Sequence, residues 1–146
     1  MRLTTFTDYC LRALTFVAVK GDELSTIDEI AERYRINRNH LKEVVFRLSQ
    51  LGYFHTLRGK GGGIRLARDP AKINLGKLIR QTEVDFVLAE CFQEQGCLCV
   101  IEPACVLKKA LRAALGAFFE VLDGYTLADL VKPSQNLARL LSAPAA

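Results

Sequence analysis

The sequence predicts a mainly α-helical fold: a winged helix-turn-helix with a small β-hairpin wing and a long C-terminal dimerisation helix. Three observations predict this fold. The first third of the chain holds three segments whose apolar residues recur with helical spacing. A glycine-rich stretch then joins two short runs that are typical of β-strands. Finally, an uninterrupted helical stripe of apolar residues follows Pro103.

The first three predicted helices each have an identifiable boundary. The first helix covers about residues 6–19 and ends at a glycine. Thr26 followed three residues later by Glu29 is a capping box, which opens the second helix. Asn37 is a good N-cap for the third helix, and Gly52 follows its last apolar residue. Two helices joined by a short polar break predict a helix-turn-helix.

The wing is predicted from the segment RGKGGG between strand-like residues 53–57 and 64–67. The order of helix, helix-turn-helix and basic hairpin is more specific than any one of these elements. A short helix over 75–81, capped by Asn74, is expected next.

The last predicted helix has apolar residues at steps of four, four, three and four. They are Leu107, Leu111, Leu115, Phe118 and Leu122. Because few partners for this stripe remain within one subunit, we expect a dimer interface. The alternative is a helix that folds back on its own domain. The expected organisation is a winged helix-turn-helix over 1–82, a cysteine-rich loop over 83–105, and a dimerisation helix with a C-terminal tail over 106–146.

Positive charge is concentrated in one third of the chain. Residues 32–68 contain nine basic and two acidic residues, a net charge of +7, and since the whole chain carries +4 the remainder carries −3. Such a patch is typical of nucleic-acid binding, although a solvated basic face or another partner would also explain it.

The candidate DNA-reading residues lie where the third helix begins, because that turn of a helix-turn-helix enters the major groove. Arg38 can pair with guanine and Asn39 with adenine, whereas Lys42 suits a phosphate. His40 belongs to the same turn. The alternative for Asn39 and His40 is local capping of the helix.

At the predicted hairpin tip, Arg58 and Lys60 lie beside four glycines. Glycine lets the backbone approach a phosphate closely, and an arginine there can enter a narrow minor groove. A nucleotide cradle is disfavoured, because no helix follows and the Walker pattern is absent.

Four of the five cysteines lie close together in the chain. They are Cys91, Cys97, Cys99 and Cys105. Thiolates are soft ligands for iron–sulfur clusters, zinc or copper(I), so this spacing favours metal or redox chemistry over idle thiols. Both histidines belong to the DNA-reading half, which disfavours a mixed Cys/His zinc site. The fifth, Cys10, lies on an apolar helical stripe, and we expect it in the core.

Several classes of protein are disfavoured. No apolar run reaches the ~18 residues of a membrane helix. The start MRLTTFTDYC lacks the apolar core of a signal peptide, so we expect a cytoplasmic protein. No nucleophile–base pair is visible, so we do not expect an enzyme. A redox protein without DNA binding, such as an electron carrier, does not explain the winged helix-turn-helix.

Five segments together carry a family resemblance. They are FTDYCLRAL, INRNHLKEVVFRLSQLGY, RGKGGGIRL, CFQEQGCLCVIEPACVLK and DGYTLADLV. They resemble the winged-helix iron–sulfur regulators, a group that includes nitric-oxide-sensing repressors and IscR-type regulators. The resemblance covers nearly the whole chain.

The resemblance implies a set of cluster ligands. Cys91, Cys99 and Cys105 match the family's three cysteines, and Cys97 is an extra thiol that is the alternative middle ligand. Asp8 matches a carboxylate ligand supplied by the partner subunit to a [4Fe–4S] cluster; a [2Fe–2S] cluster also fits these donors. The alternative for Asp8 is an ordinary acid in a first helical turn.

The resemblance also implies a mechanism. A homodimer with a cluster in each subunit would bind a palindromic operator in double-stranded DNA and repress transcription. Nitric oxide would attack the iron and release the DNA. The alternatives are a sister regulator that senses cluster or iron supply, and a zinc-dependent repressor.

Overall fold

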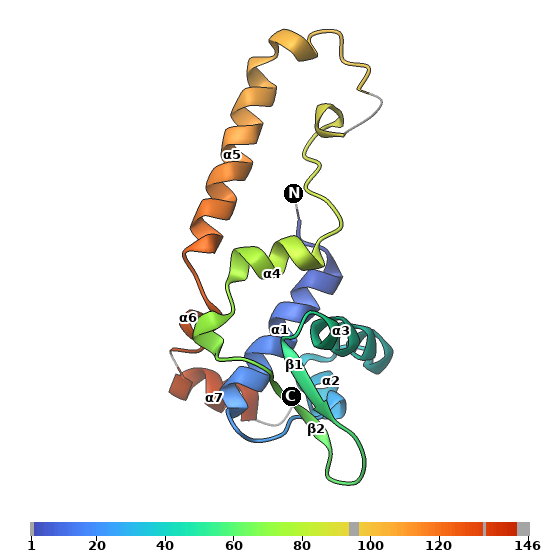
Figure 1. Cartoon of the computed structure of the whole chain (residues 1–146), viewed down its shortest axis with the longest axis vertical. Coiled ribbons are helices and arrows are strands. Elements are labelled where there is room, and N and C mark those ends of the chain that lie inside the picture. The colour runs from blue at the N-terminus through green and yellow to red at the C-terminus, as the bar shows by residue number, and fades with distance from the viewer. Residues whose placement is uncertain (1, 94–96, 133, 143–146) are drawn as a thin grey trace.

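The computed structural model describes residues 2–93, 97–132 and 134–142, and it divides into a head and an arm (Figure 1). We call residues 2–82 together with 124–142 the head, and residues 83–123 the arm. The fold is mainly helical with one two-stranded antiparallel hairpin, as the sequence predicts. The head contains α1 (Thr5–Lys20), α2 (Ile27–Tyr34), α3 (Arg38–Gln50), β1 (Phe54–Leu57), β2 (Gly63–Leu66), α4 (Leu75–Thr82), α6 (Leu127–Val131) and α7 (Ser134–Ser142).

The first helices begin where their side chains cap them. The Thr26 hydroxyl accepts a hydrogen bond from the Glu29 N–H at 3.1 Å, and the Glu29 carboxylate accepts one from the Thr26 N–H at 2.7 Å. This confirms the predicted capping box. Asn37 caps α3 by accepting from the Asn39 N–H at 2.8 Å. Both caps satisfy N–H groups that have no partner within their helix.

The core of the head forms around α1, which contacts α3, α6 and α4. Leu14, Leu41 and Leu48 are fully buried there, and Cys10 lies among them as predicted. Burying one such leucine stabilises the fold by roughly 1.5–3 kcal/mol. These contacts hold α3 with its opposite face toward solvent.

The hairpin pairs Phe54 with Leu66 and Leu57 with Gly63, so each strand is within a residue of the predicted range. A β-bridge joins it to the segment before α2: the Ser25 N–H donates to the Ile64 carbonyl at 2.9 Å, and the Ile64 N–H donates back at 2.7 Å. The tip requires glycine, because a Cβ on Gly62 would lie 2.2 Å from the Leu57 carbonyl oxygen.

The arm consists of segment 83–105 and α5 (Val106–Asp123), which extends away from the head (Figure 1). Among its described residues Phe119 is buried, whereas Leu107 on the predicted apolar stripe is 65% exposed. The C-terminal end of α5 therefore packs on α4, while the rest of the helix extends away from the head. That it forms a dimer interface stays a prediction.

The chain returns to the head after α5, which the sequence analysis did not predict. Leu127 at the start of α6 is fully buried in the core, and its N–H donates to the Ile73 carbonyl at 2.8 Å. Leu141 of α7 packs against the same core. The segment expected as a tail is thus mostly packed structure; residues 133 and 143–146 lie outside the described residues.

Candidate DNA-binding surface and metal centre

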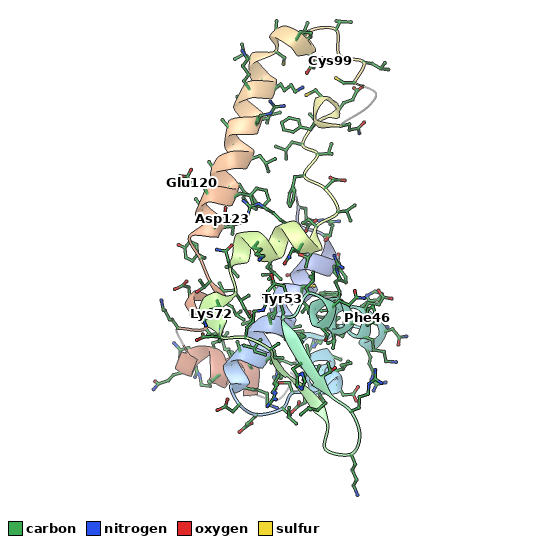
Figure 2. The ribbon with its side chains drawn as sticks, in the orientation of Figure 1. Phe46, Tyr53, Lys72, Cys99, Glu120 and Asp123 are labelled. Atoms are coloured by element: carbon green, nitrogen blue, oxygen red, sulfur yellow. The ribbon has the colours of Figure 1, made fainter. Side chains whose placement is uncertain are left out.

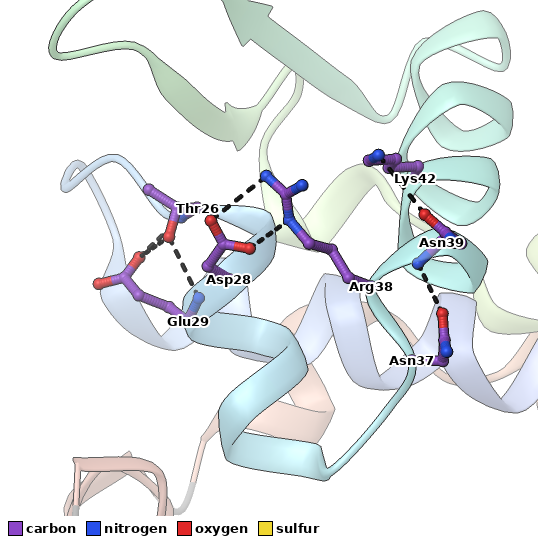
Figure 3. Close-up of polar contacts among 7 residues, drawn as sticks. All are labelled: Thr26, Asp28, Glu29, Asn37, Arg38, Asn39 and Lys42. Carbon is purple, nitrogen blue, oxygen red and sulfur yellow. Dashed lines mark hydrogen bonds and ion pairs between the residues drawn. The ribbon is translucent and has the colours of Figure 1, made fainter.

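The start of α3 presents the four predicted reading residues on one exposed turn. Arg38, Asn39, His40 and Lys42 are all exposed. Asn37 provides the cap through its own side chain, so the Asn39 amide is not needed for local capping. Its oxygen accepts from Lys42 Nζ at 3.5 Å, a long contact at the surface (Figure 3). The Asn39 side chain therefore has no capping role and is exposed to solvent, as a base contact requires.

Arg38 has a partner that the sequence analysis missed. Its guanidinium forms a two-point ion pair with the carboxylate of Asp28 on α2, with Nη2 at 3.4 Å from Oδ2 (Figure 3). Both side chains are more than half exposed. Since exposed ion pairs are weak, Arg38 can exchange Asp28 for a guanine edge.

The basic segment contains structural arginines as well as candidate DNA contacts. Arg58 and Lys60 are exposed at the hairpin tip, as predicted. Arg68 instead donates to the Gly52 carbonyl at 2.7 Å, and its guanidinium lies 4.7 Å from the centre of the Tyr53 ring. It fastens the base of the wing to the end of α3. The guanidinium of Arg68 therefore has a structural role, although its charge still contributes to the local +7.

The four clustered cysteines all lie on the arm. Cys91 is in the turn η2 (Glu90–Phe92), and Cys105 follows the turn η3 (Glu102–Ala104) and caps α5. Cys97 and Cys99 lie between these turns, and Cys99 is the exposed one of the four (Figure 2). The hydrophilic residues 94–96 of this loop lie outside the described residues.

Among residues 2–93, 97–132 and 134–142, no three cysteine, histidine or acidic side chains are gathered into a metal site. The chemistry of the donors nevertheless fits an iron–sulfur cluster, because each loop cysteine is free and at least partly accessible. The Cys105 sulfur accepts from the Lys108 N–H at 3.4 Å. At this helix N-terminus the backbone dipole favours a bound anion such as an anionic cluster.

Cys10 is in a different environment from the loop cysteines. It is fully buried between helices of the head. Burial raises the pKa of its thiol to about 12, although the charge of Arg47 acts in the opposite direction. Cys10 therefore stays a neutral thiol at physiological pH and is unsuited to bind metal.

Asp8 lies in the first turn of α1 and forms an ion pair with Arg12 one turn later, at 2.8 Å. This is the ordinary helical role named as its alternative. Within one subunit Asp8 belongs to the head, whereas Cys99 is at the far end of the arm (Figure 2). The structure of a single chain does not bring them together.

Contacts through α4 connect the start of α1 with α5. The Thr7 hydroxyl donates to the Thr82 hydroxyl at 3.0 Å inside the head. Arg80 donates to both carboxylate oxygens of Asp123 at 2.6 and 2.8 Å, which lowers the pKa of Asp123. Gly76 makes room for this pair, since a Cβ there would lie 1.9 Å from Asp123 Oδ1. We call Arg80 and Asp123 the α4–α5 ion pair.

An exposed recognition helix beside a basic β-wing defines a winged-helix DNA-binding protein. Solved structures agree. IscR of T. potens superposes with a TM-score of 0.71 at 26% identity, covering 94% of this chain and 90% of that one. The oxidised form of Staphylococcus aureus CymR superposes with a TM-score of 0.71 at 25% identity, covering 90% of this chain and 97% of that one.

The chain belongs to the Rrf2 family, described as iron-dependent transcriptional regulators, whose model matches residues 3–133. It is 54% identical over 142 residues to the HTH-type transcriptional regulator NsrR of Bacillus subtilis, covering 97% of each chain. The regulator of the same name from Bacillus licheniformis is 48% identical over 143 residues, covering 97% of this chain and all of that one. The protein is thus a transcriptional regulator and not an enzyme. Within the described residues no helix has the length and apolar character to span a membrane.

Proposed function

We propose that the protein is a cytoplasmic, homodimeric repressor whose operator affinity depends on an iron–sulfur cluster that reacts with nitric oxide. The observation that carries this proposal is the pairing of two sites in one chain. A recognition helix with exposed polar side chains lies in the head, and four free thiols lie on one loop of the arm. Its relatives named NsrR are HTH-type transcriptional regulators, which supports the DNA-binding part of the proposal.

In this proposal Cys91, Cys99 and Cys105 hold the cluster, with Cys97 as the alternative middle ligand. Asp8 of a second copy supplies the fourth ligand to a [4Fe–4S] cluster, and a [2Fe–2S] cluster is the alternative. A bound cluster would supply iron that nitric oxide can attack. A carboxylate is a harder and weaker ligand for such iron than a thiolate, so a bond from Asp8 to the iron would be the weakest of the four.

The residues of the chain provide a route from the arm to the head. Asp8 forms its ion pair with Arg12 when it is not a ligand. The start of α1 and the end of α5 both contact α4 through hydrogen-bonded side chains. A change at either end therefore reaches the helices that carry α3. A loss of about 3 kcal/mol would lower operator affinity ~150-fold.

Dimerisation fits the arm, because Leu107 and Val121 of α5 are 65% and 61% exposed. We propose that residues 1–82 form the DNA-binding unit, 83–105 the cluster loop and 106–123 the dimerisation helix. The returning segment from 124 onward supports the head. A two-fold dimer would read a palindromic double-stranded operator.

Anaerobic purification tests the cluster directly. We expect a coloured dimer that contains iron and acid-labile sulfide. A colourless zinc protein would favour the zinc-dependent repressor instead. A coloured protein whose DNA binding follows iron supply and ignores nitric oxide would favour the sister regulator.

Single cysteine variants test the ligand set. Cys99→Ala should abolish the cluster, whereas Cys97→Ala should retain it, and iron content with visible absorption reports both. The reverse pattern would make Cys97 the middle ligand.

A further inference from the structure

The recognition helix exposes one large aromatic side chain. Phe46 is 65% exposed, although its neighbours Val44, Val45 and Leu48 are buried in the core. Figure 2 shows Phe46 on the outer side of α3, away from Tyr53. A phenyl ring on a polar surface contributes nothing to the core.

Phe46 continues the row of side chains that begins at the DNA-reading turn. Asn39, Lys42, Glu43 and Phe46 are spaced i, i+3, i+4 and i+7, and all four are exposed. Residues three and four apart share one helical face. Homeodomain recognition helices read bases from four positions with this same spacing. Phe46 therefore shares the face of α3 that carries the predicted base contacts.

The chemistry of that face specifies what Phe46 can recognise. The other three side chains can pair with base edges or phosphates, but a phenyl ring has no hydrogen-bonding group. The apolar feature of the major groove is the C5-methyl group of thymine, which phenylalanine contacts in known complexes. We propose that Phe46 is a specificity-determining residue that packs on a thymine methyl group.

The proposal deepens the operator binding proposed above and rests on it. Phe46 lies seven residues after Asn39, or about 10 Å along the helix axis. That distance corresponds to about three base-pair steps. The thymine should therefore lie about three base pairs from the base that Asn39 contacts, and on each half-site of a two-fold operator.

The experiment starts from a random-sequence duplex pool selected with the anaerobic full-length protein. Wild type and Phe46→Ala should select the same motif, except that the variant loses its preference at one thymine in each half-site. Uracil, which lacks the 5-methyl group, is then placed at that thymine in both half-sites. Burying one methyl group is worth about fourfold in affinity, so wild type should lose about 15-fold. Phe46→Ala should be indifferent to the exchange.

Two controls separate the possible failures. Leu140→Ala removes another exposed apolar side chain of the head, 64% exposed, and should keep the full uracil effect. Phe46→Ala should also keep the salt dependence of binding, since it removes no phosphate contact. A wild type that selects no motif would overturn the proposed function. A selected motif that Phe46→Ala shares in full, or a changed oligomeric state in that variant, would overturn the role of Phe46 alone.

Discussion

The head and the arm differ in how far their apolar side chains are buried. In the head, Leu14 and Leu41 are fully buried, whereas in the arm Leu98 and Val100 are 85% and 94% exposed. Contiguous exposed apolar surface of this kind marks a site of interaction. The head forms a closed apolar core within one chain, whereas the arm leaves most of its apolar side chains outside any core. We infer that the arm is the part whose structure responds to dimerisation and to the cluster.

The cysteines show the same difference at the level of single residues. Cys10 in the head is held as a neutral thiol by burial, whereas Cys99 in the arm is open to solvent. The same side chain therefore serves as core packing in one region and as a candidate ligand in the other.

The largest expected effect tests the packing of the two regions. Leu14→Ala removes a fully buried side chain and should lower the free energy of unfolding by about 2–5 kcal/mol. Val100→Ala should change it by less than about 0.5 kcal/mol, because the side chain is exposed. Urea denaturation measures both. Equal losses would contradict the distinction between head and arm.

The next effect tests the two kinds of cysteine. Cys105→Ala should lose the cluster. Operator binding should then weaken ~150-fold, because the cluster-loaded form is the one proposed to bind DNA tightly. Cys10→Ala should keep its iron and bind the operator as wild type does. Iron analysis and fluorescence anisotropy with labelled operator provide the readouts. Iron loss in Cys10→Ala with an intact fold would show that the buried thiol has a role in the arm.

A smaller effect tests the connection between the regions. Asp123→Asn weakens the α4–α5 ion pair and should reduce the nitric-oxide response of operator binding by roughly tenfold, while leaving the iron content unchanged. Lys77→Ala removes a different exposed charged side chain, a base on α4, and is the control. If both variants keep the full response, the signal does not pass through this ion pair.

The same ion pair predicts a pH dependence. Since Arg80 lowers the pKa of Asp123 in the folded protein, the stabilisation is fully present above the ordinary aspartate pKa of about 3.9. It is lost as the pH falls through the lowered value. Acid titration of wild type and Asp123→Asn, followed by circular dichroism, should therefore converge at low pH. Unfolding curves that stay parallel down to low pH would show that the α4–α5 ion pair does not stabilise the fold.

The smallest effect concerns the head alone. Asp28→Ala frees Arg38 and removes a carboxylate near the DNA-reading turn. We expect binding to random-sequence duplex to tighten about two- to fivefold, the range of an exposed ion pair. Arg38→Ala should instead cost about 1–3 kcal/mol on operator DNA and relax its specificity. Weaker binding by Asp28→Ala would mean that the ion pair positions Arg38 for reading.

Local signals in the sequence predicted most of the head. The Thr26–Glu29 capping box and the Asn37 cap depend on neighbours within three residues, so the chain itself displays them. The ion pair of Arg80 with Asp123 joins residues 43 positions apart, and no local pattern indicates it. The packing of α6 and α7 on the head was missed for the same reason. Leu127 is buried by residues that are distant from it in the sequence, so no local pattern indicates its burial. The cysteine spacing predicted a metal loop, but the part of the chain that the structure describes does not gather three such ligands into one site.

Operator affinity during anaerobic titration with nitric oxide tests the central claim most directly. The iron-loaded dimer should bind its operator tightly and lose ~150-fold in affinity as nitric oxide is added, in step with the change in its visible absorption. An iron-loaded protein whose operator affinity stays constant while its absorption changes would contradict the claim that the arm controls the head.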